Sequence, residues 1–98
     1  MPNVEITCEQ NIVIRENDNL SCWCKAFRDN FFPKATWVKN GHVLGIPSSK
    51  GQQIYLHNIS KEASGTYVCR AQLYTLIGEK SVEITVQCKP FFLFIRIF

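Results

Sequence analysis

The five cysteines, Cys8, Cys22, Cys24, Cys69 and Cys88, are the residues of this 98-residue chain whose chemistry is most evident. In an oxidising compartment such residues pair as disulfides, whereas a zinc site would need paired C-x-x-C spacing, which the sequence lacks. The high cysteine count for this length therefore predicts disulfides and an oxidising compartment. We expect neither a bound metal nor a cofactor.

Two asparagines stand in glycosylation acceptor patterns, Asn19-Leu20-Ser21 and Asn58-Ile59-Ser60, neither of which has proline in the middle. Both patterns agree with an extracellular protein. The N-terminal residues 1–5 do not show the basic start and apolar run of a secretory signal. We therefore expect a fragment of an extracellular or cell-surface protein whose signal and anchor lie outside this chain; the alternative is a chain that stays inside the cell.

No arrangement of residues for catalysis emerges from the sequence. His42 is expected in a turn and His57 at an outward strand position, without a paired nucleophile or carboxylate. A glycine-rich phosphate loop is also missing. The 11 basic and 8 acidic residues give a net charge of +3, but the basic residues are scattered along the chain. We therefore expect no enzyme, no small-molecule substrate and no nucleic-acid partner.

The elements that position these residues are short strands, because β-branched and aromatic residues recur between Gly, Pro, Asn and Asp without a helical period. The predicted strands are residues 4–8, 12–15, 20–27, 35–39, 54–57, 65–73 and 80–87. Turn signals between them include residues 40–41, 47–51 and 77–78. Many short strands at this spacing predict an all-β sandwich or barrel with a hydrophobic core from the 46% apolar residues.

Alternation within the predicted strands separates an inward face from an outward face. Residues 20, 22, 24 and 26 share one face of the third strand, and residues 23, 25 and 27 share the other. Tyr67, Cys69 and Ala71 share a face in the sixth strand. Cysteines at inward positions of two strands are therefore able to meet inside a sandwich.

Cys24, Trp37 and Cys69 follow one another at the spacing of an immunoglobulin sandwich, and Tyr67 precedes Cys69 by two residues, as in the tyrosine corner of that fold. This constellation, with Gly65, predicts a Greek-key sandwich of two sheets. Its expected core is a disulfide between Cys24 and Cys69, with the Trp37 ring packed on it.

Residues 58–69 resemble the turn between strands E and F of intermediate-set immunoglobulin domains. Residues 14–24 and 70–80 are similar to the entry into strand B and to the F-to-G hairpin of the second domain of the neural cell adhesion molecule and fasciclin type. The resemblance covers about residues 10 to 88. It implies an extracellular protein-binding module of a cell-adhesion or cell-recognition receptor, which acts through sheet faces and edges. Its partner would be a protein, either a second copy or a related immunoglobulin receptor. The alternative is an intracellular structural domain of the giant muscle-protein type.

Two departures from that family bear on the fold. Ala63 stands where the family usually has Asp, with Glu62 as a partial substitute. The segment between Trp37 and Ile59 is several residues shorter than usual, so we expect strand D to be shortened or missing.

The pairing of the other cysteines stays open at this point. Cys22 also points inward and competes with Cys24 for Cys69, although the spacing to Trp37 favours Cys24. A first strand antiparallel to the third would bring Cys8 to Cys22, but both could equally remain buried thiols. Cys88 is left over, either unpaired or linked to a neighbouring domain.

The outward positions of two neighbouring strands carry Trp23, Phe27, Tyr55 and His57. Aromatic residues are enriched at protein interfaces, so this set is a candidate docking surface. The alternative is that the first strand or the connection between strands C and E covers it. In the loop before Ala35, we expect one of Phe31 and Phe32 to fill the core beside that small residue.

Lys89-Pro90 is expected to end the domain, which gives an immunoglobulin-like domain over residues 1–90 and a hydrophobic tail over residues 91–98. Eight residues interrupted by Arg96 are too few for a membrane span, which needs about 20. The tail is therefore the start of a membrane segment, a strand of a following domain or a non-domain sequence. We expect membrane association only through an anchor outside this chain.

Overall fold

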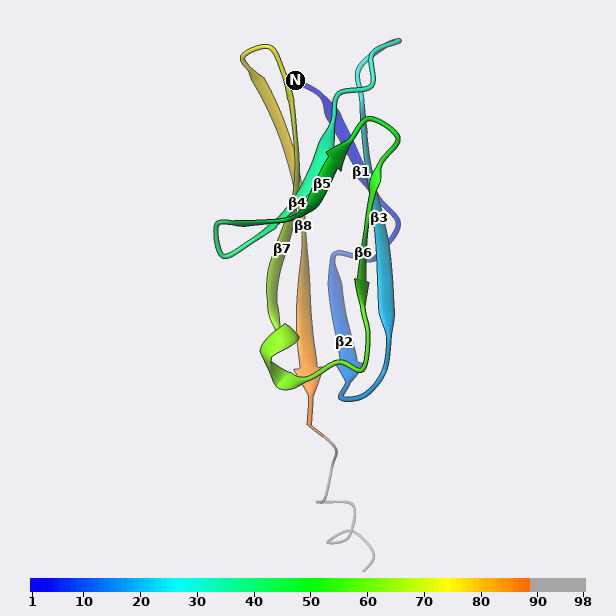
Figure 1. Cartoon of the computed structure of the whole chain (residues 1–98), viewed down its shortest axis with the longest axis vertical. Helices are drawn as coiled ribbons and strands as arrows, with labels where there is room; N and C mark the ends of the chain where they lie inside the picture. The colour runs from blue at the N-terminus through cyan, green and yellow to red at the C-terminus, as the bar shows by residue number, and fades with distance from the viewer. Residues whose placement is uncertain (89–98) are drawn as a thin grey trace, which may run out of the picture.

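Two β-sheets lie face to face in the computed structural model, which describes residues 1–88 (Figure 1). The first sheet has the order β1 (Asn3–Ile6), β3 (Leu20–Phe27), β6 (Gln52–Leu56). The second has the order β2 (Asn11–Arg15), β8 (Leu76–Gln87), β7 (Gly65–Leu73), β4 (Ala35–Lys39), β5 (His42–Ser48). One 3-10 turn, η1 (Lys61–Ala63), precedes β7. The predicted all-β immunoglobulin-like sandwich is confirmed. Its predicted tail, residues 91–98, lies outside the described residues.

The core follows the alternation of the sequence. Alternate residues in each of three strands are buried, with exposed or partly exposed residues between them: 22, 24 and 26 of β3, 67, 69 and 71 of β7, and 82, 84 and 86 of β8. Trp37 from β4 is fully buried among them. The buried hydrophobic residues are Cys22, Cys24, Ala26, Ala35, Trp37, Ile54, Ile59, Tyr67, Cys69, Ala71, Val82, Ile84 and Val86.

Three strands, β3, β4 and β7, begin and end where the sequence predicted. Strand β5 was not predicted, because its sequence contains Gly45 and Pro47, which usually interrupt strands. It forms at the edge of the second sheet, paired with β4 through an irregular register between Ala35 and Trp37. The predicted turn at residues 47–51 therefore begins later, and Gly51 closes it by donating to the Ser48 carbonyl.

The residues that become β5 leave none for a strand D. Among residues 1–88, no strand pairs with β6 on the side away from β3. The predicted shortening or loss of strand D is therefore confirmed, and β6 is an edge of its sheet.

The turn predicted at residues 77–78 was wrong, because both residues lie within β8. The chain reverses at Tyr74, whose φ is 56°, just before β8 begins. Gly78 is needed for a different reason: a Cβ there would lie 2.2 Å from the carbonyl oxygen of Pro2. A glycine in a strand often marks such a close backbone approach.

The turn before β7 is held by Lys39, which the sequence analysis did not single out. Its Nζ donates to the Glu62 carbonyl oxygen and to the Tyr67 hydroxyl, at 3.0 Å each, while the Tyr67 hydroxyl donates to the Ala63 carbonyl oxygen at 2.6 Å. The lysine thus binds oxygens of a turn that lacks the usual acidic side chain, and Glu62 contributes its carbonyl group to that contact. Gly65, with a φ of +141°, leaves room for the lysine stem, which would lie 3.1 Å from a Cβ at that position.

Gln52 closes the side of the sandwich where strand D is missing. Its side-chain Oε1 accepts from the Trp37 backbone N–H at 2.9 Å, and its backbone carbonyl accepts from Trp37 Nε1 at 2.9 Å. Its side-chain amide donates to the Leu44 carbonyl oxygen. Gly45 allows this contact, because a Cβ there would overlap the Gln52 amide. One buried polar side chain of β6 therefore binds both β4 and β5 of the facing sheet.

Replacing Gln52 by leucine should destabilise the protein by about 1–3 kcal/mol, because the buried Trp37 backbone N–H would lose its partner. Equilibrium unfolding in urea measures the change in the free energy of unfolding. Gln53→Leu, at the exposed neighbouring position, is the matched control and should change it by less than about 0.5 kcal/mol. Equal effects of the two substitutions would contradict this role of Gln52.

Candidate functional site

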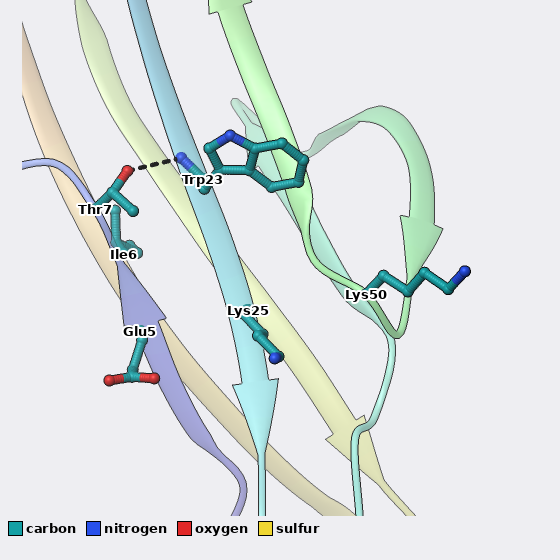
Figure 2. Close-up of a pocket in the computed structure, with 6 residues that line it drawn as sticks. All are labelled: Glu5, Ile6, Thr7, Trp23, Lys25 and Lys50. Atoms are coloured by element: carbon teal, nitrogen blue, oxygen red, sulfur yellow. Dashed lines mark hydrogen bonds between the residues drawn. The ribbon is translucent and has the colours of Figure 1, made fainter.

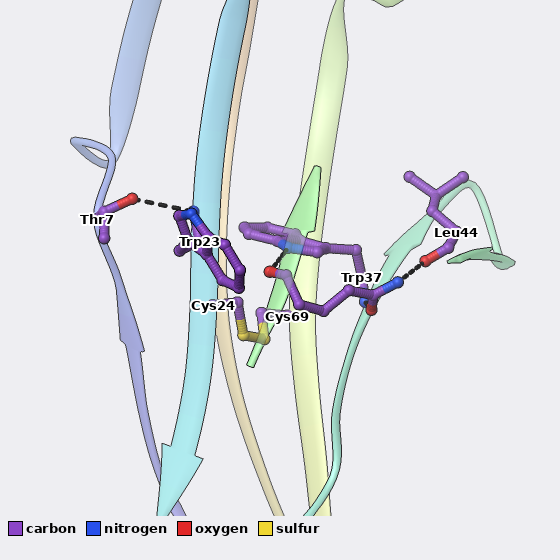
Figure 3. Close-up of a disulfide and its surroundings, with 7 residues drawn as sticks. Thr7, Trp23, Cys24, Trp37, Leu44 and Cys69 are labelled. Carbon is purple, nitrogen blue, oxygen red and sulfur yellow. Dashed lines mark hydrogen bonds between the residues drawn. A yellow bond between two sulfur atoms is a disulfide. The ribbon is translucent and has the colours of Figure 1, made fainter. Parts of the chain in front are cut away.

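The Cys24–Cys69 disulfide joins the two sheets at the centre of the sandwich, with a Cα–Cα distance of 6.3 Å. Trp37 lies beside it between the sheets (Figure 3). A second disulfide joins Cys8 to Cys22, with a Cα–Cα distance of 5.5 Å. The register explains this pairing, because Ile6 lies opposite Cys24 and the antiparallel chain brings Cys8 opposite Cys22 two residues later. Cys22 is therefore not available to Cys69.

Cys88 is exposed and free. When the full chain is denatured without reductant, it should therefore take up one thiol-specific label. The labelled peptide should contain Cys88. After reduction, all five cysteines should react. Peptide mass spectrometry locates the label, and the Cys88→Ser variant is the control that should take up none. A label on Cys8 or Cys22 before reduction would contradict the second disulfide.

Three of the four predicted surface aromatics lie together on the outward face of the β1-β3-β6 sheet. Trp23 is 47% exposed and lies opposite Gln53, so Tyr55, which is 59% exposed, is its diagonal neighbour. The Tyr55 and His57 rings are stacked, with centroids 6.0 Å apart and planes at 22°. We refer to Trp23, Tyr55 and His57 as the aromatic face.

Phe27 does not belong to the aromatic face. It lies at the far end of β3, opposite Asn3, and it is only partly exposed. At about 3.3 Å per residue, it is roughly 13 Å from Trp23 along the strand. The sequence placed it on the same side of the strand but could not show this separation from Tyr55 and His57.

Trp23 lies between Thr7, which follows β1, and Gly51 of the loop before β6. Its backbone N–H donates to Thr7 Oγ1 at 2.9 Å, and its ring would lie 3.5 Å from a Cβ at Gly51. Figure 2 shows the hollow beside it, which has a volume of about 330 Å³. It is lined by Glu5, Ile6, Thr7, Trp23, Lys25 and Lys50. The exposed indole thus stands at the rim of a shallow hollow with two lysines.

Both Phe31 and Phe32 are exposed, at 59% and 52%, so the prediction that one of them fills the core was wrong. The backbones of Arg28 and Phe31 bond to each other in both directions, at 2.9 and 2.8 Å, and form a tight turn. Pro33 is the buried residue before Ala35. Phe32 instead lies under Lys25, whose Nζ is 5.1 Å from the ring centroid.

The two predicted glycosylation acceptors are neighbours in space. Asn19 and Asn58 are both exposed, and the Asn58 backbone N–H donates to Asn19 Oδ1 at 2.8 Å. The Ile59 backbone N–H bonds to the Asp18 carbonyl at 2.9 Å, which holds the two segments together. Both acceptors therefore lie at one end of the sandwich, beyond β6.

The described residues offer little for chemistry. His42 and His57 are exposed, and residues 1–88 contain no group of three or more His, Cys, Asp or Glu side chains that could hold a metal ion. Glu62 is an exposed carboxylate of η1. Hydrogen bonds from the Ser60 side chain and from the Glu62 backbone lower its pKa. Within residues 1–88, no helix has the length and apolar character needed to cross a bilayer.

A protein-family model described as "Immunoglobulin domain" matches residues 3–87. The chain therefore belongs to the immunoglobulin-domain family. It is 34% identical over 96 residues to "Protein turtle homolog B" of Mus musculus, and equally so to the protein of the same name from Homo sapiens. These alignments cover 92% of this chain but only 7% of those relatives.

Solved structures with the same fold come from different kinds of protein. The N-terminal four Ig domains of Dscam1 isoform 4.44 match with a TM-score of 0.70 and 17% identity, over 88% of this chain and 21% of that chain. An Ig chain of the Titin M10–Obscurin like 1 complex matches with a TM-score of 0.67 and 18% identity, over 82% and 88%. At such identities, these likenesses show the fold alone.

Proposed function

We propose that this chain is an extracellular protein-binding module of a cell-adhesion or cell-recognition receptor, and that it binds through the aromatic face. The observation that carries this proposal is the group Trp23, Tyr55 and His57, which the strand register gathers on one exposed sheet. Tyr and Trp are enriched at protein interfaces and at their energetic centres. The lysines of the adjacent hollow add a polar rim to this surface.

The extracellular location is supported by the two disulfides and the two exposed acceptor asparagines. The resemblance to the neural cell adhesion molecule and fasciclin type points the same way, and we keep the intermediate-set assignment as part of the proposal. We also propose one domain over residues 1–90, since β8 ends at Gln87 and the family match at residue 87.

The second candidate is an intracellular structural domain of the giant muscle-protein type. The likeness to titin Ig domains favours it, but at 18% identity that likeness concerns the fold. A reducing cytosol does not maintain disulfides, so two of them argue for the first candidate. On either account, the chain acts by surface complementarity, without catalysis, cofactor or nucleic acid.

Protein made through a secretory pathway should carry glycans at Asn19 and Asn58. Removal of N-glycans should lower the intact mass, and Asn19→Gln and Asn58→Gln should each remove one glycan in mass spectrometry. Asn30→Gln is the control, because Asn30-Phe31-Phe32 is not an acceptor pattern. If neither site carried a glycan, the intracellular candidate would become the better account.

The double variant Trp23→Ala, Tyr55→Ala should weaken protein binding by about tenfold or more, because such aromatic residues supply much of the energy of an interface. The test is staining, by multimerised protein, of cells that display individual immunoglobulin receptors, this chain included. Tyr74→Ala is the matched control, since Tyr74 is an 84% exposed aromatic residue in the β7–β8 turn of the other sheet. If the double variant bound as well as the parent while Tyr74→Ala lost binding, the aromatic face would not be the binding site.

A further inference from the structure

The edge of β6 has backbone groups without partners, and the hydrogen bonds of β3 show which ones. Trp23 accepts from the Thr7 N–H at its carbonyl oxygen, at 3.0 Å, and donates its own N–H to Thr7 Oγ1. Both backbone groups of Trp23 therefore point towards β1, on the side away from β6. It follows that Trp23 and Gln53, which lie opposite each other, form a pair without hydrogen bonds.

In an antiparallel pair, such residues direct their other backbone groups outward, and the pattern repeats every second residue. The N–H and C=O groups of Gln53 and Tyr55 therefore point away from β3, to the side where strand D is missing. Among residues 1–88, no hydrogen bond reaches these groups from that side. A groove of about 280 Å³, lined by Leu44, Gly45 and the residues of β6, runs along them.

The other three edge strands of the sandwich carry features that discourage pairing with another chain. β1 contains Glu5, β2 contains Arg15, and β5 contains Pro47. Charges and prolines of this kind are the usual protection of exposed edges. β6, with the sequence QQIYL, has no charged residue and no proline. The edge without such protection thus also has a groove beside it.

We propose that a second copy of this chain pairs with this edge, β6 against β6, antiparallel about a twofold axis at Ile54. This inference deepens the proposed protein-binding function and rests on it. In this register, Gln53 of one copy lies opposite Tyr55 of the other, so the outward N–H and C=O groups of both residues find partners in both copies.

The second copy is the occupant that this strand fits best, because its edge is complementary to itself. With no charge in β6, a twofold axis brings no like charges opposite each other. The Ile54 side chains meet on the core side of the strand, close to the Leu44 and Leu56 side of the groove. The two three-stranded sheets join into one continuous sheet. Interfaces of this self-complementary kind are typical of symmetric dimers.

The test is the self-association of the oxidised full chain, without glycans and with Cys88→Ser to exclude a disulfide-linked dimer, by analytical ultracentrifugation. Gln53→Pro removes an outward N–H without removing a bond to β3, and should weaken the dimer by about tenfold or more. Gln53→Thr is the matched control, because it changes the side chain and keeps the N–H, and should remain within about threefold of the parent. Circular dichroism verifies that each variant folds.

At about 100 μM, complexes with a Kd of the same order are still detected. If the parent is monomeric at this concentration, the proposal is overturned. Equal association of the parent and Gln53→Pro would also overturn it. If the proline variant does not fold, amide exchange of the parent decides: Gln53 and Tyr55 should gain protection as concentration rises, and no gain overturns the proposal. The staining experiment on Trp23→Ala, Tyr55→Ala is independent, so a monomeric parent that still binds another receptor leaves the proposed function standing.

Discussion

The Cys24–Cys69 disulfide is the constraint on which the rest of the sandwich depends, because it is the covalent link between the two sheets. It closes 45 residues of chain, which on the chain-entropy model contributes about 4 kcal/mol to stability. Its position also sets the environment of Trp37, which packs beside it and is fully buried. Because Trp37 then needs partners for its indole and backbone N–H groups, the polar residue Gln52 is buried in an otherwise apolar core.

Gln52 in turn explains how the fold tolerates the loss of strand D. Its side chain reaches across the open side of the sandwich to β4 and to the Leu44 carbonyl of β5. This polar contact holds the two sheets together where a strand would otherwise cover them. It leaves the outward backbone groups of Gln53 and Tyr55 unused, because those groups lie on the opposite side of the strand from β3. The loss of strand D therefore shortens the domain and also leaves an edge that is able to bind another strand.

The period of a β-strand couples the core to the proposed binding surface. Cys22 and Cys24 point inward and form two different disulfides, so the residue between them, Trp23, must point outward. The two disulfides cross-link β3 on either side of Trp23, and Trp23 lies diagonally opposite Tyr55 of β6. A rigid aromatic residue loses little conformational entropy when it binds, which supports the proposed role of the aromatic face.

The sequence by itself predicted which strand residues face inward and the bounds of three strands, because side chains alternate along a strand. The Cys, Trp, Cys spacing favoured Cys24 over Cys22 as the partner of Cys69. The sequence also showed that strand D lacked residues, since chain length sets that limit. Only the tertiary structure decided the rest. The register of β1 against β3 places Cys8 opposite Cys22, which become partners in a disulfide. Pairing with the edge of β4 places residues 42–48 in a strand despite their poor strand propensity. The separation of Phe27 from Tyr55 and His57 and the buried position of Gln52 likewise depend on contacts between segments far apart in the chain, which no local pattern encodes.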